Sequence, residues 1–200
     1  MDDFACTLIL DHAREGAHVR TAFFEAHAEL LQKAALSAAR CLAQGGKLLL
    51  CGNGGSAADS QHLAAEFVNR FLIDRPALPA IALTTDSSVL TAVGNDASFD
   101  TVFSRQVEAL GQEGDVLLGI STSGRSTNVI LALQAARERK LTTIGLTGAG
   151  GGSMGELCDF LFTVPSEKTP VIQEVHLACE HLFCQLVDYY LFDNAAALAL

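Results

Sequence analysis

The chain has 200 residues, of which 50% are hydrophobic and only 18% charged, and its formal net charge is −10. This length is typical of one compact domain. The acidity, the absence of Trp and the presence of only two Tyr argue against a nucleic-acid groove, because such a groove needs clustered cations and stacking aromatic rings. No apolar run is long enough to span a bilayer, so we expect no membrane partner.

The apolar content and the cysteines bear on assembly and location. A mean hydropathy of +0.30 indicates either a generous core or surface buried between subunits, and we expect the second, a homo-oligomer. The six cysteines form no Cys-x-x-Cys pair, which favours buried, reduced thiols. The chain begins Met1-Asp2-Asp3 rather than with the basic segment of a secretory signal, so we expect a soluble, cytoplasmic protein.

The first part of the chain is predicted to be helical. Apolar residues recur at helical spacing over residues 2–26 and again over 27–43, and Gly45-Gly46 ends the second helix. Residues 1–44 are therefore expected to form a helical N-terminal extension that packs on a sheet and at a subunit interface.

Beyond residue 46 the sequence alternates between short apolar runs and helical patterns. The runs show no polar alternation, as strands of a parallel sheet covered on both faces require. The predicted strands cover residues 47–51, 79–83, 116–120, 142–146 and 161–164. The predicted helices cover residues 57–71, 100–110, 127–139, 153–158 and, as a long closing helix, 171–191. The pattern predicts one α/β domain over residues 1–200, with a doubly wound, five-stranded parallel sheet of the flavodoxin-like kind.

A glycine-rich loop follows the first predicted strand. It reads Gly52-Asn53-Gly54-Gly55-Ser56-Ala57 and opens a helix, so its backbone can approach a ligand closely and offer free N–H groups. The loop also fits the G-x-G-x-x-A dinucleotide fingerprint, which requires an acidic residue about 20 positions on, at the end of the second strand. Asp74 precedes that strand and Asp86 is too distant, so the dinucleotide remains the weaker alternative.

A second loop follows the third predicted strand, at the same carboxyl edge of the sheet where ligands bind in such folds. It reads Ser121-Thr122-Ser123-Gly124-Arg125-Ser126. Its four hydroxyls and the N–H groups of the next helix are suited to one phosphoryl group. Ser126 as a simple helix cap is the alternative, but that role leaves the other hydroxyls unexplained.

Two helices carry candidate catalytic side chains. His62 and Glu66 are four residues apart and share one helix face, either as a surface pair or as part of a site. The closing helix carries a cluster of polar residues, which need partners in so apolar a stretch: Gln173, Glu174, His176, Glu180 and His181. His176 and His181 are about 140° apart around the helix, so only one of them can face a given site, and spacing alone does not choose.

Five motifs together resemble a known family. They are GNGGSA (52–57), VGNDASF (93–99, read as a strand–loop segment), EGDVLLGIS (113–121), STSGRS (121–126) and IQEVHLACEH (172–181). This combination, which covers nearly the whole chain, resembles the SIS-domain phosphosugar isomerases. It is most similar to the members that act on sedoheptulose 7-phosphate.

The resemblance implies roles for particular residues. The sugar would contact Asn53, Gly54, Gly55, Asn95 and Asp96. The phosphate would contact Ser121, Thr122, Ser123 and Ser126, with Ser56 nearby. One Zn²⁺ per subunit would be bound by His62, Glu66, Gln173 and His181, and Glu66 and Gln173 would also contact substrate. Glu66 and His181 would be the catalytic acid–base pair. Arg125 and Val171 depart from the family pattern. The family often has an arginine where this chain has Val171.

The resemblance also implies an activity. The chain would be a zinc-dependent, cytoplasmic homotetramer that converts D-sedoheptulose 7-phosphate into D-glycero-D-manno-heptose 7-phosphate through an enediol. This reaction would be the first step of ADP-heptose synthesis for the lipopolysaccharide core. Two alternatives remain: a non-catalytic SIS protein that binds a replication initiator, or an isomerase of another sugar phosphate. The presence of both Glu66 and His181 favours the enzyme.

Overall fold

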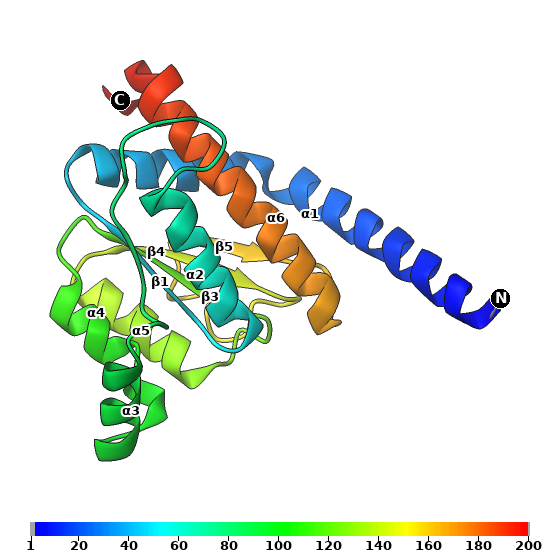
Figure 1. Ribbon diagram of the computed structural model, residues 1–200, viewed down its shortest axis with the longest axis horizontal. Helices are drawn as coiled ribbons and strands as arrows, with labels where there is room; N and C mark the ends of the chain where they lie inside the picture. The colour runs from blue at the N-terminus through cyan, green and yellow to red at the C-terminus, as the bar shows by residue number, and fades with distance from the viewer. Residues whose placement is uncertain (1–2, 200) are drawn as a thin grey trace.

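The computed structural model describes residues 3–199, and its centre is a five-stranded parallel sheet with strand order β2-β1-β3-β4-β5 (Figure 1). Every predicted strand is confirmed to within two residues at each end. The strands are β1 (Leu48–Gly52), β2 (Ala80–Ala82), β3 (Val116–Ser121), β4 (Thr142–Thr147) and β5 (Phe160–Thr163). The register pairs Leu50 with Ala82 on one side and with Leu118 on the other.

Helices cover both faces of the sheet, as the apolar strands predict. They are α1 (Asp3–Ala43), α2 (Gly55–Val68), α3 (Ser87–Asp96), α4 (Ser104–Leu110), α5 (Thr127–Glu138) and α6 (Thr169–Asp188). Successive strand residues point to opposite faces, so Leu48 and Leu50 pack with α1, α2 and α6, whereas Leu49 and Cys51 pack with α4 and α5. Short 3-10 turns (Phe99–Thr101 and Ala195–Ala199) and a π-helical turn (Tyr189–Asp193) complete the chain.

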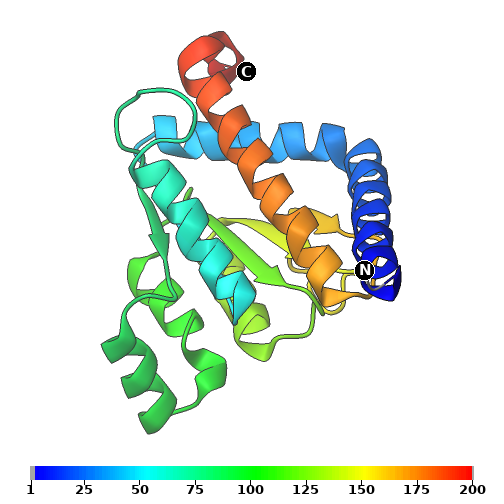
Figure 2. The same cartoon turned by 45° about the vertical axis from the view of Figure 1, so that its right-hand side comes forward.

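Some predicted helix boundaries are wrong. The two opening helices are one continuous helix, α1, because no glycine or proline separates them. Figure 2 shows that the two halves of α1 run in different directions. Residues 153–158 form turns rather than a helix, and the preceding Gly150, Gly151 and Gly152 all have positive φ, which a right-handed helix excludes.

Helix α3 was not predicted, and it occupies part of the segment read as a strand and loop. It begins at the N-cap Asp86, whose carboxylate accepts a hydrogen bond from Val89 N at 3.0 Å. None of its residues, 87–96 of the described chain, is buried, so it has no apolar stripe for sequence periodicity to reveal. The predicted helix at 100–110 is split into the 3-10 turn at Phe99–Thr101 and α4.

The cysteines are free, and those at 41, 51, 179 and 184 are buried as predicted, although Cys6 is exposed. Burial raises the pKa of the Cys51 thiol to about 12 and that of the Cys41 thiol to about 11. These thiols are therefore packing residues rather than nucleophiles. None of the helices in residues 3–199 combines the length and the apolar character that a membrane-spanning segment needs.

Candidate active site

The two predicted ligand loops meet at one edge of the sheet. Strands β1 and β3 are neighbours and parallel, so the loops after them leave the sheet side by side. Two hydrogen bonds join them: Asn53 Nδ2 donates to Asn128 Oδ1 at 2.8 Å, and Asn128 Nδ2 donates to Asn53 Oδ1 at 2.9 Å. The buried Asn128 was not singled out from the sequence. It lies in the first turn of α5, just after the hydroxyl loop, where a polar residue is ordinary and does not by itself indicate a site.

The hydroxyls of the second loop point toward one another. Ser121 Oγ lies 2.9 Å from Ser126 Oγ and 3.4 Å from Ser123 Oγ. In the described chain the side chain of Ser126 makes no capping hydrogen bond to α5, so the simple cap is wrong. A compact group of hydroxyls at the N-terminus of a 12-residue helix is suited to hold an anion.

Gly124 lets this loop fold tightly. Its φ is +63°, and a Cβ at this position would collide with the carbonyl of Gly151 and lie 2.8 Å from Thr147 Oγ1. Two backbone hydrogen bonds hold the loop against the segment after β4: Ser153 N donates to Gly124 O at 2.8 Å, and Gly148 N donates to Thr122 O at 3.0 Å. These two hydrogen bonds tie the hydroxyl loop to residues 148–153.

The candidate catalytic side chains lie between α2 and α6, which run side by side in Figures 1 and 2. His62 Nε2 lies 2.9 Å from His181 Nε2 and 3.6 Å from Glu66 Oε1. The ring of Phe71 stacks on that of His181 with centroids 5.4 Å apart. The structure therefore brings together three of the four predicted zinc ligands, one of them from a helix 119 positions away in the chain.

Gln173, the fourth predicted ligand, lies near the other end of the same two helices. Its amide occupies the space beside Gly55 at the start of α2. Eight residues separate Gln173 from His181, which corresponds to about 12 Å along the helix. Within one chain, Gln173 therefore borders the glycine-rich loop instead of the two imidazoles.

His176 does not face the site. It is fully buried, and its Nε2 lies 3.2 Å from Thr147 O. Burial lowers the pKa of His176 to about 4, so the ring is neutral near pH 7 and donates to that carbonyl. The choice that helical spacing left open is thus made by packing: His181 faces His62, and His176 lies in the core.

Two carboxyl groups behind the histidines were not assigned a role from the sequence. Burial, with the nearby Asp59, raises the pKa of Glu180 well above its usual value. Burial also raises the pKa of Asp59, an effect that His62 partly offsets. Neither oxygen of Glu180 has a hydrogen-bond partner within residues 3–199, so nothing there offsets the cost of burying its charged form. Asp59 precedes His62 by three positions, and this spacing is the one sequence signal that Asp59 and His62 share a face of α2.

Asn95 and Asp96 are not brought to the helices that carry Glu66 and His181. Both are exposed near the end of α3, where Asn95 Nδ2 donates to Asp96 Oδ1 at 2.8 Å. Helix α3 projects from the sheet on the side away from α6 (Figures 1 and 2). Their contact with the sugar stays a prediction.

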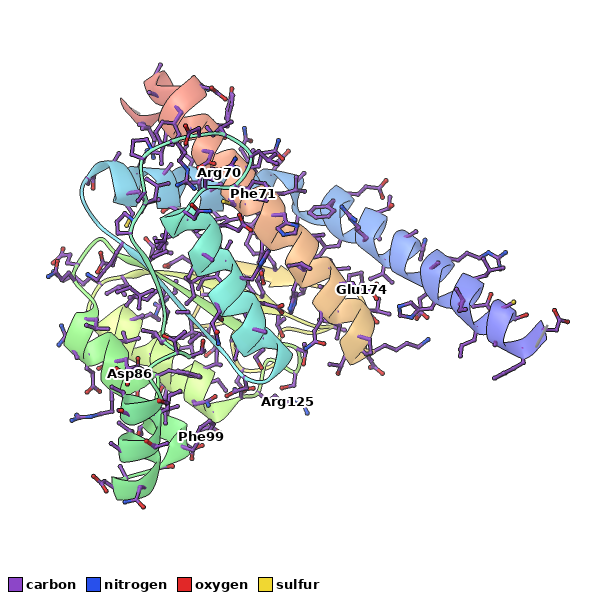
Figure 3. The ribbon with its side chains drawn as sticks, viewed as in Figure 1. Arg70, Phe71, Asp86, Phe99, Arg125 and Glu174 are labelled. Atoms are coloured by element: carbon purple, nitrogen blue, oxygen red, sulfur yellow. The ribbon has the colours of Figure 1, made fainter. Side chains whose placement is uncertain are left out.

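The two departures from the family pattern have different surroundings. Val171 is 1% exposed and belongs to the core. Arg125 is exposed and lines a cavity of about 240 Å³ together with Thr122, Ser123 and Thr169, and Figure 3 shows it at the end of the molecule where α2 begins. Arg125 thus adds a positive charge beside the hydroxyl loop, where an anion would bind.

The donor atoms for a metal are only partly assembled. Among residues 3–199, no group of three or more His, Cys, Asp and Glu side chains is arranged to hold a metal ion as it stands. Nevertheless, His62 and His181 point their Nε2 atoms at each other, with a carboxylate oxygen beside them. Two imidazoles and one carboxylate form a donor set typical of catalytic zinc.

Comparisons with known proteins agree on one family. A model of the SIS domain matches residues 11–148. A phosphoheptose isomerase of Desulfovibrio desulfuricans is 63% identical over 199 residues, which cover 100% of this chain and 95% of the relative. One from Burkholderia pseudomallei is 51% identical over 97% of this chain and 100% of its own length.

Solved structures agree with the sequence comparisons. The phosphoheptose isomerase of Neisseria gonorrhoeae superposes with a TM-score of 0.87 at 45% identity, over 92% of this chain and 98% of that chain. That of Francisella tularensis superposes with a TM-score of 0.88 at 37% identity over the same shares. The doubly wound sheet with its long first and last helices is therefore the architecture of solved phosphoheptose isomerases.

Proposed function

The chain belongs to the SIS-domain family and, within it, to the phosphoheptose isomerases, and from this premise we propose that it converts D-sedoheptulose 7-phosphate into D-glycero-D-manno-heptose 7-phosphate. The observation that carries the proposal is the meeting of His62, Glu66 and His181 between α2 and α6, in a chain that also carries a hydroxyl loop. A non-catalytic role is not favoured, since relatives at 51–63% identity are isomerases.

In this proposal the hydroxyl loop binds the phosphate. Ser121, Thr122, Ser123 and Ser126 would supply hydroxyls, and the first N–H groups of α5 would add the positive end of the helix dipole. Ser56 at the start of α2 would contribute from the first loop, where Asn53, Gly54 and Gly55 would border the sugar. The mutual proximity of the serine hydroxyls supports this role.

Glu66 and His181 would perform the proton transfers. The carboxylate of Glu66 would remove a proton from C1 of the ketose, which leaves an enediol across C1 and C2, and would return the proton to C2. His181 would move the hydroxyl proton from O1 to O2 through Nδ1, the ring nitrogen that does not face His62, so that C1 becomes the aldehyde. Glu66 Oε1 lies toward His62, which leaves Oε2 for the carbon proton. Groups held at hydrogen-bond reach typically contribute factors of about 10² to 10⁴ to such transfers.

We further propose that zinc binds to His62, Glu66 and His181. The two Nε2 atoms, 2.9 Å apart, and the carboxylate of Glu66 beside them are nitrogen and oxygen donors of the kind that zinc takes. Bound zinc would supply Lewis-acid polarisation of the substrate oxygens. Gln173 as a fourth ligand stays a prediction, because it would have to leave its place beside Gly55.

The purified protein is expected to form an aldose 7-phosphate from sedoheptulose 7-phosphate, and removal of zinc with a chelator is expected to lower kcat about 10-fold or more. Coupled detection of the aldose, with metal content measured in the same samples, checks both statements, and added zinc should restore the rate. Absence of the aldose from untreated protein would reject the function. Undiminished turnover by metal-free protein would reject only the zinc.

We also propose a cytoplasmic homotetramer that serves lipopolysaccharide core synthesis. An apolar groove of about 560 Å³ runs between α1 and α6, lined mainly by Phe24, Leu31, Leu182, Leu186 and Tyr189. Leu8 and Ile9 near the start of α1 are 60% and 67% exposed. A second copy of the chain packed along α1 would cover this surface, and residues 1–44 would then serve as the interface extension.

Leu186→Asp is expected to shift the assembly toward smaller species, because it places a charge in the proposed interface. Sedimentation velocity at a fixed protein concentration measures the change. Leu110→Asp introduces the same charge at a residue that is 40% exposed at the end of α4, outside the groove, and should leave the assembly intact. An unchanged mass for folded Leu186→Asp would contradict this interface.

A further inference from the structure

The connection between α2 and β2, residues 69–79, contains a buried arginine that binds both catalytic helices. Arg75 is 9% exposed. Its Nε donates to Asp188 Oδ1 at 2.8 Å, its Nη1 to Phe67 O at 2.7 Å, and its Nη2 to Glu66 O at 2.8 Å. One planar side chain therefore bonds to the ends of two helices.

The positions of these acceptors give the arginine its significance. Glu66 and Phe67 lie in the last turn of α2, whose carbonyls have no partner within the helix. Asp188 is the last residue of α6, seven positions after His181. Arg75 thus bonds to the main chain of the proposed base and to the helix that carries the proposed acid. A guanidinium can do this because its donors form a rigid fork.

The same connection also contacts the catalytic imidazole. The ring of Phe71 stacks on His181 with an interplanar angle of 26°, and Figure 3 shows Phe71 beside α6. One face of the imidazole is therefore covered by the connection, while its Nε2 lies 2.9 Å from His62 Nε2. The stack limits rotation of the ring about its side-chain bonds.

We propose that Arg75 and Phe71 are positioning residues that fix the separation and orientation of Glu66 and His181 across the gap between α2 and α6. The inference rests on the proposed function, because it assigns these two side chains to proton transfer. Neither residue contacts the hydroxyl loop in any hydrogen bond or ring contact described for residues 3–199. The expected effect therefore falls on turnover and leaves substrate capture unchanged.

A matched pair of substitutions separates positioning from stability. Asp188→Asn removes the buried charge paired with Arg75. Asp115→Asn removes an equally buried charge, 2% exposed, which pairs with Lys47 Nζ at 2.6 Å. Asp115 lies at the amino end of β3, the edge opposite the hydroxyl loop. Both changes should lower Tm, but only Asp188→Asn should lower kcat, by about 10- to 100-fold with KM within about twofold.

Three further variants keep the test decisive if Asp188→Asn folds poorly. Arg75→Lys keeps the charge but loses the fork, and should lower kcat in the same way. Phe71→Leu should lower kcat, whereas Phe71→Tyr, which preserves the stack, should restore it. Equal losses of kcat in Asp188→Asn and Asp115→Asn at matched Tm, or wild-type kcat in Arg75→Lys and Phe71→Leu, would overturn the proposal.

A readout without turnover distinguishes this inference from the proposed function. The ring protons of His181 should show an upfield NMR shift from the stacked Phe71, and Phe71→Leu should remove that shift. If the shift is present but the wild-type protein makes no aldose, the proposed function fails while the placement of the ring holds. If the shift is absent from the wild-type spectrum, the positioning by Phe71 fails.

Discussion

Glu66→Gln is expected to abolish isomerisation while the protein remains folded. The amide has nearly the same shape as the carboxylate but cannot accept a proton from carbon, so kcat should fall about 10²- to 10⁴-fold. The hydrogen bond from Arg75 reaches the main-chain oxygen of Glu66 and is unaffected by the change. The coupled aldose assay measures the loss, and deuterium exchange from solvent into the substrate should stop as well.

Glu174→Gln is the matched control for this change. Glu174 lies on α6 (Figure 3). Its side chain is 53% exposed and pairs with His12 on α1 at 2.8 Å. The same loss of a charge there should leave kcat and KM near those of the wild type. Wild-type turnover in the Glu66→Gln variant would remove Glu66 from the mechanism and leave the fold assignment intact.

Gly124→Ala is expected to disable the hydroxyl loop. The position has φ +63°, which costs a residue with a Cβ about 1–2 kcal/mol. The Cβ would also meet the carbonyl of Gly151 and lie 2.8 Å from Thr147 Oγ1, so the backbone must shift. Because Ser123 and Ser126 flank this glycine, we expect kcat/KM to fall about 100-fold. Steady-state kinetics and thermal unfolding measure the two effects.

Gly114→Ala separates backbone strain from loop displacement. Gly114 has φ +90°, and a Cβ there would meet no heavy atom within 4 Å. It precedes β3 at the opposite edge of the sheet, so the substitution should lower stability by a similar strain of about 1–2 kcal/mol with full activity. An unchanged kcat/KM in Gly124→Ala would show that the phosphate binds elsewhere.

The sheet was predictable because its signals are local. Uninterrupted apolar runs such as Leu48–Gly52 and Val116–Ser121 can be satisfied only by burial on both faces. Parallel strands place their carboxyl ends at one edge, so the sequence predicted that the glycine-rich and hydroxyl loops lie at the same edge of the sheet. That the two loops are neighbours follows from the pairing of β1 with β3. The pairing of His62 with Glu66 also followed from helical spacing.

Helices without a continuous apolar stripe were less predictable. Helix α1 is continuous through Ala26 and His27, and residues 24–30 around them are all exposed or half-buried. Helix α3 has a clear N-cap in Asp86, but none of its described residues is buried. In both cases the signal of periodicity was weak because burial, its physical cause, was partial or absent.

By itself the sequence determined the layered α/β architecture, the two loops and the residue types of the site, since each depends on neighbours within a few positions. Helical spacing left His176 and His181 open, and the family resemblance chose His181; the tertiary structure supplied the physical reason, since His181 faces His62 while His176 is buried. Only the tertiary structure showed that Arg75 bonds to Asp188, 113 positions away. Such choices depend on how α6 is rotated against α2 and the sheet. That rotation is set by the packing of many side chains together, and no local spacing encodes it.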